Sequence, residues 1–309
     1  MAKIGIEKCN SNLSLHQILY ILVPIGYLLM HQKITIHGTA FVTSLFRAGN
    51  AELSKDRYAH LWANSTVEDH ANSYSAAVSK YEPYAHCLRN RYFYDKMVEL
   101  IEKESVEVLI NFGCGFSMYP FILDKDILFI EVDKEDVIAF KKDQISNWQK
   151  QGLLLPKNIQ YLAADFNQTN HTSLLEVLQK LKGNKKSLIL LEGVLFFLAA
   201  QDTYLLFDLF HALQKKGDYV GSVSFTPLLE KEAVFTKLIN FVERNLEKNQ
   251  QFQYQTVPDE FYQNLDGYEL LEHRDTFSLS KQYRPAKVLP ESEVLNEHMY
   301  LLKKNADNY

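Results

Sequence analysis

The sequence predicts an α/β fold in which a doubly wound, mostly parallel sheet carries helices on both faces. Short runs rich in leucine and β-branched residues, typical of buried strands, occupy residues 106–112, 127–133, 159–165, 187–193 and 219–225. Helix-length amphipathic segments separate them at residues 134–149, 169–182 and 202–215. This alternation predicts parallel strands, because each crossover must return the chain to the same edge of the sheet. Such sheets bind ligands beyond the carboxyl ends of their strands.

The segment before the first strand has a helical pattern instead. Between residues 38 and 103 glycines are few and apolar residues recur at spacings of three to four, most clearly in 91–101. We therefore divide the chain into an N-terminal helical region, residues 1–104, and a ligand-binding domain, residues 105–309.

The segment after the fifth strand completes the predicted fold. Residues 228–248 have the pattern of a long amphipathic helix, and residues 267–277 and 297–303 are predicted to form a closing antiparallel strand pair. Residues 285–294 between them are predicted to be a loop. The sheet is therefore expected to end in strands that are not all parallel.

An apolar run of 13 residues, 18–30, stands near the N-terminus. It is shorter than the roughly 20 residues of a membrane-spanning helix, and Pro24 and Gly26 interrupt it. No small-residue cleavage site follows it, as a secretory signal would require. We expect residues 13–30 to form a helix on the body of the protein or over the substrate pocket, with a membrane or partner contact as the alternative.

Composition excludes several classes of function. The net charge is −5 and the basic residues are scattered, so the basic face of a nucleic-acid-binding protein is missing. The three cysteines, Cys9, Cys87 and Cys114, are widely spaced and have no metal-site spacing. The sequence therefore favours a small-molecule substrate, no metal, reduced thiols and a cytoplasmic location.

The first two predicted strands end in residues suited to a nucleoside ligand. After the first comes a turn with Gly113 and Gly115, which allows backbone N–H groups to approach a ligand closely. Met118 stands where a dinucleotide fingerprint has its third glycine, which disfavours NAD. The second strand ends in Asp133, about 20 residues further on, where a carboxylate accepts hydrogen bonds from ribose hydroxyls.

The next two strand ends add two more carboxylates. Asp165 and Phe166 follow the third strand and suit the amine and flat face of adenine, and Glu192 ends the fourth. Each residue also has a structural interpretation: the glycines as a plain turn, Asp165 as a helix cap, Glu192 as half of a buried ion pair with an arginine. Four such strand ends in succession favour a ligand site. Cys114 is expected to pack, not to react, because no histidine is near it in the sequence.

Five segments of this sequence together resemble the leucine carboxyl methyltransferase-like family of class I S-adenosylmethionine-dependent O-methyltransferases, which includes enzymes of bacterial secondary metabolism. They are RNRYFYD (89–95), INFGCGFSMYPFIL (110–123), FIEVDKEDVIAFKK (129–142), AADF (163–166) and LLEGVLFFL (190–198). The resemblance covers roughly residues 39–225. It implies a seven-stranded sheet with a reversed strand at one edge and an N-terminal helical lid.

The resemblance also implies a cofactor and roles for individual residues. The cofactor would be S-adenosylmethionine, converted to S-adenosylhomocysteine. Its methionine carboxylate would meet Arg89 or Arg91, its methionine part would pack on the turn from Gly113 to Gly115, and Glu192 would hold its amino group. Asp133 would hold the ribose, and Asp165 with Phe166 the adenine. One departure is Ser117-Met118, where the family commonly has Asp-Thr, so a hydrogen-bonding acid near the cofactor is missing.

The expected reaction is methyl transfer to an oxygen of a small-molecule or peptide-like acceptor. A carboxylate acceptor needs no base, whereas a hydroxyl needs one, for which His86 and His273 are the candidates. The alternatives are a non-catalytic cofactor-binding protein and an NAD-dependent oxidoreductase.

Overall fold

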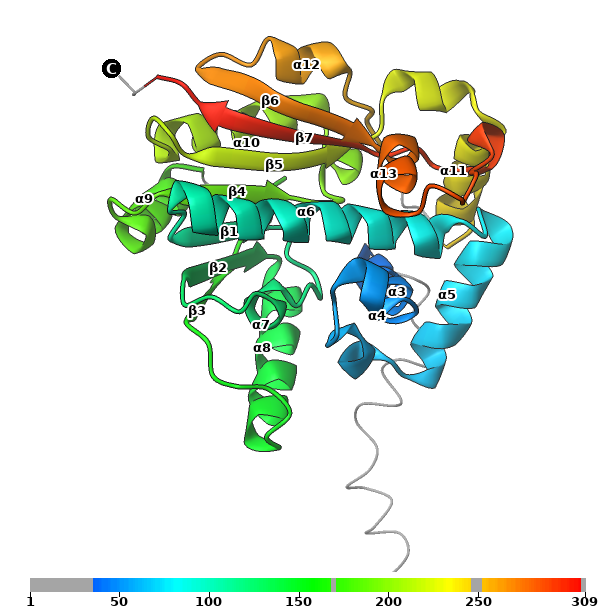
Figure 1. The fold of residues 1–309 in the computed structure, drawn as a ribbon, viewed down its shortest axis with the longest axis horizontal. Helices are drawn as coiled ribbons and strands as arrows, with labels where there is room; N and C mark the ends of the chain where they lie inside the picture. The colour runs from blue at the N-terminus through cyan, green and yellow to red at the C-terminus, as the bar shows by residue number, and fades with distance from the viewer. Residues whose placement is uncertain (1–35, 168–170, 246–251, 307–309) are drawn as a thin grey trace, which may run out of the picture.

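The computed structural model describes residues 36–167, 171–245 and 252–306, which fold around one seven-stranded sheet of order β3-β2-β1-β4-β5-β7-β6 (Figure 1). The strands are β1 Val108–Phe112, β2 Leu128–Asp133, β3 Ile159–Ala163, β4 Ser187–Leu191, β5 Tyr219–Ser224, β6 Tyr268–Asp275 and β7 His298–Lys304. Each predicted strand is present within a few residues of its expected ends. The predicted fold class is confirmed.

The direction of the strands sets the position of the strand ends. β1 lies at the centre of the five strands β1 to β5 and pairs in parallel with β2 and β4, while β3 and β5 extend the parallel part on either side. β7 pairs antiparallel with both β5 and β6 and lies second from its edge of the sheet. The carboxyl ends of β1 to β4 therefore meet along one rim, as parallel pairing requires.

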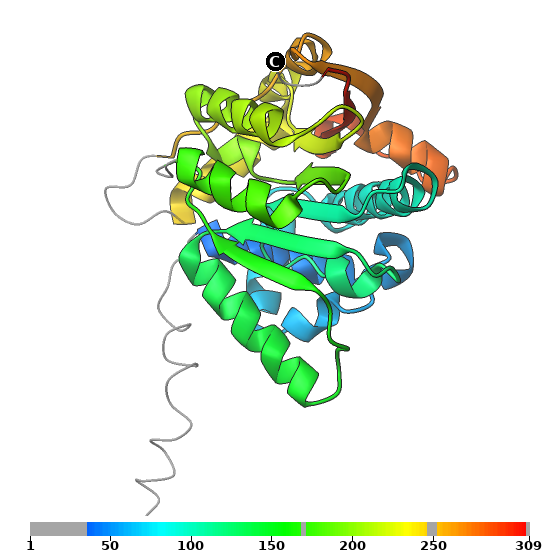
Figure 2. The same cartoon turned by 90° about the vertical axis from the view of Figure 1, so that its left-hand side faces the viewer.

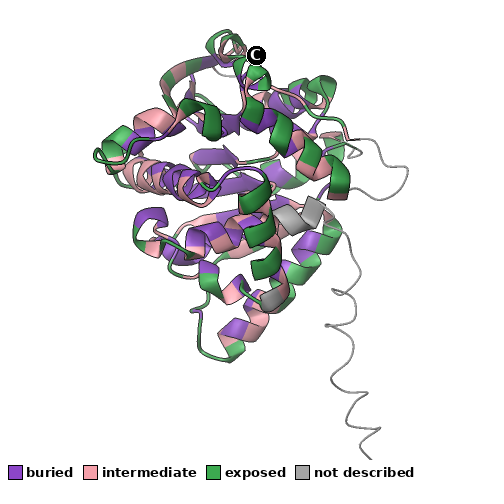
Figure 3. Cartoon of the chain, turned by 90° about the vertical axis from the view of Figure 1, so that its right-hand side faces the viewer, coloured by how far each residue is buried: buried purple, intermediate pink, exposed green. Residues whose placement is uncertain are grey.

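Helices cover both faces of this sheet (Figure 1, Figure 2). One face packs on α6 Glu82–Glu104, α8 Glu135–Lys150 and α13 Thr276–Tyr283, and the other on α9 His171–Lys182, α10 Ala200–Leu213 and α12 Asp259–Gln263. Neighbouring residues of a strand belong to opposite cores: Leu109 packs with α6, whereas Ile110 packs with the other layer. Figure 3 shows the buried residues on the strands and on the helix faces that meet them.

The N-terminal helical region precedes β1, and its long last helix, α6, packs along one face of the sheet (Figure 1). It contains α3 Ile36–Ala48, α4 Ala51–Ser54, the short helix η1 Ala59–Trp62, α5 Ser65–Ala77 and the long helix α6. The side chain of Asn64 accepts from the Val67 N–H and begins α5, and Ser105 ends α6 in the left-handed conformation. α6 approaches β5 closely at Gly221, where an added Cβ would lie 2.9 Å from Phe93. α6 ends at Glu104, beside the predicted boundary at residue 105.

Three parts of the C-terminal segment differ from the sequence prediction. In place of the helix predicted over 228–248 the structure has two elements, η3 Pro227–Lys231 and α11 Ala233–Asn245. Residues 246–248 of the predicted helix lie outside the described part. The predicted strand 267–277 ends at Asp275, because that side chain caps α13 in a reciprocal capping box with Ser278. The predicted loop contains the short helix η4 Glu291–Glu293.

The apolar run 18–30 lies outside the described residues, as does the whole segment 13–30 that we expect to form a helix. Among the residues that are described, no helix has the length and apolar character needed to span a bilayer.

Candidate functional site

A pocket opens at the rim formed by the carboxyl ends of β1 to β4, between α3 and α6. It collects seven of the residues predicted from the sequence, which come from five separate segments: Arg89, Gly113, Gly115, Asp133, Asp165, Phe166 and Glu192. Three other predicted residues do not line it: Arg91, His86 and His273. The strand-end residues therefore converge as the parallel sheet requires.

The glycine turn has a shape that only glycine fits. Gly113 has φ +66°, and a Cβ on it would lie 2.1 Å from Cγ2 of Val194. Gly115 has φ +42°, and its backbone N–H donates to Oδ2 of Asp133 at 2.8 Å. The Asp133 carboxylate also accepts from the Lys134 N–H at 2.8 Å. The turn after β1 is thus fixed to the acid that ends β2.

A buried ion pair contacts the backbone of this turn. Lys141 of α8 and Glu131 of β2 are in contact, and both are almost fully buried. The Lys141 ammonium also lies 3.5 Å from the carbonyl oxygen of Cys114. Burial raises the pKa of the Cys114 thiol well above its ordinary value, so this side chain stays a neutral thiol. A packing role for Cys114 and not a nucleophilic one is consistent with this environment.

Asp165 and Phe166, which the sequence predicts to contact adenine, both line the pocket. Phe166 is buried against Phe112, with the ring centroids 5.6 Å apart. Asp165 is partly exposed, accepts from the Asn167 N–H at 3.2 Å, and lies 3.8 Å from the ammonium of Lys134. A carboxylate beside an aromatic face is therefore available to a flat, hydrogen-bonding ring.

Arg89 enters the pocket from α6 between two carboxylates. Its Nε donates to Glu192 at 3.1 Å, and its Nη1 contacts Glu297, the residue before β7. Tyr119 donates its hydroxyl proton to the other oxygen of Glu192 at 2.6 Å. Burial lowers the pKa of Arg89, but Glu297 and Glu192 outweigh it and raise this pKa overall. Glu192 is thus both a pocket wall and half of a buried ion pair, so its two interpretations coexist.

Arg91 lies on a different side of α6. Residues that are two apart in an α-helix differ by about 200° around the helix axis, so Arg89 and Arg91 cannot face the same pocket. The Arg91 side chain donates to Asp95 at 2.9 Å and stacks 4.9 Å from the centre of the Tyr283 ring. The geometry therefore selects Arg89 of the two predicted arginines.

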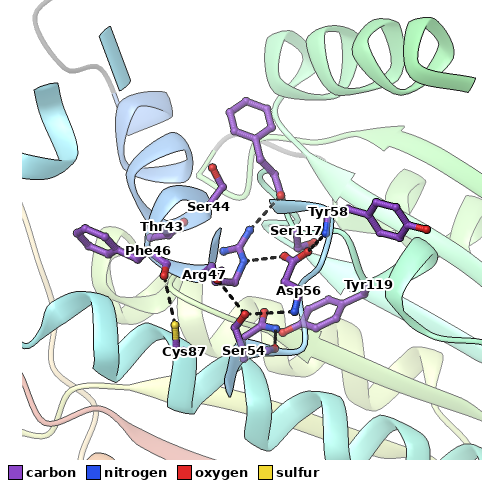
Figure 4. Close-up of polar contacts among 12 residues, drawn as sticks. Thr43, Ser44, Phe46, Arg47, Ser54, Asp56, Tyr58, Cys87, Ser117 and Tyr119 are labelled. Carbon is purple, nitrogen blue, oxygen red and sulfur yellow. Dashed lines mark hydrogen bonds and ion pairs between the residues drawn. The ribbon is translucent and has the colours of Figure 1, made fainter. Parts of the chain in front are cut away.

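A second arginine in the pocket, Arg47 of α3, escaped the sequence prediction (Figure 4). Its Nε donates to Asp56 at 3.0 Å and its Nη2 donates to the carbonyl oxygen of Phe116 at 3.0 Å. The side chains of Arg47 and Asp56 are 7% and 1% exposed, so this pair is rigid and desolvated. An arginine in the last turn of an otherwise apolar helix was the available signal.

Asn111 is a further pocket residue that the strand pattern concealed. It lies inside the buried strand β1, and its amide donates to the Ser117 hydroxyl at 2.9 Å. Ser117 itself lines the pocket at the position where the family commonly has an acid. A neutral amide and hydroxyl pair therefore occupies the place of that carboxylate.

The two candidate histidines have structural surroundings. His86 is buried against the Phe46 ring and lies 3.6 Å from Glu82, one turn earlier on α6. Burial holds the pKa of His86 well below its ordinary value. His273 belongs to β6 and contacts His298 at 2.8 Å. Among the described residues, the pocket has no histidine in its wall.

Comparison with known proteins identifies the family. The model of the leucine carboxyl methyltransferase family matches residues 36–211, more than half of the chain. A crystal structure of a candidate methyltransferase from Thermobifida fusca YX superposes with a TM-score of 0.61 at 15% identity, covering 93% of this chain and 100% of that one. A DUF574 family protein from Streptomyces avermitilis gives 0.57 at 12% identity, covering 86% and 97%. At these identities the two structures show the shared fold. No curated protein sequence matches the chain. The chain belongs to the leucine carboxyl methyltransferase family, and it is an S-adenosylmethionine-dependent methyltransferase.

Proposed function

We propose that this enzyme methylates an oxygen of a small molecule or peptide-like metabolite, and that the oxygen belongs to a carboxylate. The observation that carries the choice is the pocket wall, which among the described residues contains no histidine to act as a base. A carboxylate arrives ionised, so its oxygen attacks without losing a proton, whereas a hydroxyl must be deprotonated. The family description, leucine carboxyl methyltransferase, agrees with this choice. Methylation of a hydroxyl is the second candidate.

The residues of the pocket fit the parts of the cofactor in a definite order. Arg47 and Arg89 approach from α3 and α6 beside the glycine turn, where they would face the methionine carboxylate. Glu192, next to Arg89, would accept from the methionine ammonium. Asp133 at the end of β2 would accept from the ribose hydroxyls.

The adenine would contact Asp165 and Phe166, which follow β3 and line the pocket. When bound, S-adenosylmethionine supplies a methyl group that is already electrophilic because it is carried by a sulfonium. The protein's own task is to hold the acceptor oxygen in line with that methyl group and to exclude water.

An aromatic wall adjoins the arginine end of the pocket and would hold the body of the acceptor. Phe197 lines the pocket and packs with Phe196 at 5.2 Å between ring centroids. Phe196 in turn contacts Phe225, Phe235 and Phe252. Such a surface favours an acceptor with an apolar body behind its carboxylate.

The proposal is tested by the chemistry of the product. The full chain is incubated with methyl-labelled S-adenosylmethionine and a metabolite extract, and the products are treated with mild base. A methyl ester then releases its label as methanol, while a methyl ether or methylamine keeps it. We expect base-labile label, and less of it with the Asp133→Ala variant at the same subsaturating cofactor concentration. Base-stable label would overturn the carboxylate assignment.

The location of the enzyme in the cytoplasm and the function of residues 13–30 as a pocket cover stay predictions. So does the division into a lid, residues 1–104, and a cofactor-binding domain, residues 105–309. A protein with residues 1–30 deleted tests the cover, since acceptor turnover should fall more than S-adenosylhomocysteine binding.

A further inference from the structure

Three metal-ligating side chains meet at the outer edge of the sheet, away from the pocket wall. They are Asp259 at the start of α12, His273 of β6 and His298, the first residue of β7. These elements lie side by side at the same edge in Figure 1. His273 Nε2 is 2.8 Å from His298 Nδ1, and Asp259 Oδ1 is 3.7 Å from the first nitrogen and 3.5 Å from the second.

These distances match a coordination sphere. Three atoms separated by 2.8, 3.5 and 3.7 Å lie on a circle with a radius of about 2.0 Å, so one point is about 2.0 Å from all three. This is the length of Zn–N and Zn–O bonds in proteins. Two imidazoles and one carboxylate are also a ligand set that divalent transition metals prefer. The three ligand atoms are therefore close enough together for one ion to contact all of them.

The surroundings of the three ligands hold them in place. The Tyr300 hydroxyl donates to the same Asp259 oxygen at 2.5 Å, and the Tyr300 ring stacks on His273 with centroids 4.7 Å apart. Tyr262 stacks on the other side of Tyr300 at 3.7 Å. The ligand side chains are 15% to 34% exposed, which leaves a path for an ion and room for water ligands.

We propose that Asp259, His273 and His298 bind one divalent transition-metal ion, represented by Zn²⁺, at a structural site separate from the pocket. The ion would join three chain segments: the one that follows β5 and both strands of the edge pair. His298 follows Glu297, whose side chain points to the other face and contacts Arg89. The ion would thus hold in place the residue that follows Glu297, which is one of the two carboxylate partners of Arg89. This proposal does not depend on the identity of the methyl acceptor.

The contacts of Asn296 oppose metal binding in one respect. The side-chain amide of Asn296 donates to Asp275 at 3.1 Å, and its side-chain oxygen Oδ1 accepts from the Thr276 N–H at 3.1 Å. The second N–H of this amide therefore faces His298 Nε2 at 3.2 Å. With the Asn296 amide donating to Nε2, the ring proton of His298 is assigned to Nδ1, which faces Nε2 of His273. A bound ion displaces that proton to Nε2, and the Asn296 amide must then move away. The cost lowers the affinity below that of a fully preformed site.

The experiment uses the full chain, stripped of metal by chelation and titrated with Zn²⁺ by calorimetry and with Co²⁺ by visible absorption. We expect one equivalent of each ion, a d–d absorption band for Co²⁺, and a rise in melting temperature with Zn²⁺. His273→Ala and Asp259→Asn should each weaken binding by about 100-fold or more. His60→Ala is the control, because among the described contacts the side chain of this exposed histidine bonds only to the Arg57 carbonyl oxygen.

Each result decides the proposal. Loss of binding in His273→Ala and Asp259→Asn, but not in His60→Ala, supports it. Absence of Zn²⁺ and Co²⁺ binding in the unmodified chain overturns it without any variant. Binding that survives His273→Ala and Asp259→Asn also overturns it, because the ion must then lie elsewhere. Melting curves of the metal-free variants show that they remain folded.

Discussion

The two ends of the pocket are built in different ways. At the end where we propose that adenine and ribose bind, called the ribose end, each polar residue stands at or just after the end of a strand, and the contact between Gly115 and Asp133 spans 18 residues. At the arginine end, Arg89 contacts Glu192 and Glu297, which are 103 and 208 residues away in the sequence. The first end is therefore visible in strand-by-strand patterns, while the second exists only after the chain has folded.

The two ends also differ in charge compensation. Asp133 at the ribose end accepts from two backbone N–H groups and stays accessible to a ligand. At the arginine end, Arg89 contacts Glu192 and Glu297, and the buried carboxyl group of Glu82 interacts electrostatically with Glu297 and Arg89. Burial and, to a lesser extent, the charge of Glu297 raise the pKa of Glu82 to about 8, against the opposing effects of Tyr74 and Arg89. The comparison indicates that the arginine end is held by coupled charges and the ribose end by local hydrogen bonds.

The largest effect is expected from Arg89→Met. Removing the guanidinium leaves Glu192 and Glu297 buried without a cation, and breaking a buried ion pair in this way costs about 3–5 kcal/mol. The control is Arg91→Met, two residues later on α6, whose pair with Asp95 is partly exposed and contributes at most about 1 kcal/mol. Chemical denaturation of both variants measures the difference. Equal losses would contradict the contrast between the two arginines.

A smaller loss is expected from Gly113→Ala, which tests the backbone of the ribose end. The new Cβ would lie 2.1 Å from Val194, so the turn must shift and S-adenosylhomocysteine binding should weaken by about 100-fold, or about 2.8 kcal/mol. Gly152→Ala is the matched control, because Gly152 also has a positive φ, +74°, but nothing lies near its added Cβ. Calorimetry should show unchanged binding for the control. Similar binding by both variants would show that the turn at Gly113 is not part of the cofactor site.

Asp133→Ala should weaken S-adenosylhomocysteine binding by about 1–3 kcal/mol, since the ribose hydroxyls lose a charged acceptor and the Gly115 N–H loses its partner. Glu135→Ala, on an exposed side chain two residues later, is the control and should bind normally. Unchanged binding by a folded Asp133→Ala protein would exclude Asp133 from the site. The result separates local hydrogen bonding from the coupled charges at the other end.

The smallest effect is expected from the titration of Glu82, when it is expressed as the change in the free energy of unfolding per pH unit. Its pKa is about 8 in the folded protein against 4.5 for the free group, so the folded state holds a proton that the unfolded state has lost between these values. This contribution to stability is complete below pH 4.5 and falls by at most about 1.4 kcal/mol per pH unit as the pH rises toward 8.

The Glu82→Gln variant lacks this titration, so its free energy of unfolding should decline less between pH 5 and 8. Comparing it with the unmodified protein isolates Glu82, because His86 and Glu297 titrate in both. Parallel curves for the two proteins would show that Glu82 is ionised when folded.

The sequence determined the features that depend on residues close along the chain. Leucine and β-branched runs marked strands β1 to β5, and the turn glycines, Asp133, Asp165 and Glu192 each stand at a strand end, where parallel pairing brings them together. α13 escaped because Asp275 ends a strand and caps a helix at once, and that depends on the geometry of its backbone.

Tertiary structure alone decided which arginines enter the pocket and what surrounds them. The helical pattern of α6 could not distinguish Arg89 from Arg91, because the choice depends on which side of the helix meets the sheet. Arg47 is separated from the strand ends by more than 60 residues, and its partners Asp56 and Phe116 come from two different segments. Contacts across such separations carry no periodic signal, so they become visible only when packing of the apolar cores has fixed the position of every element.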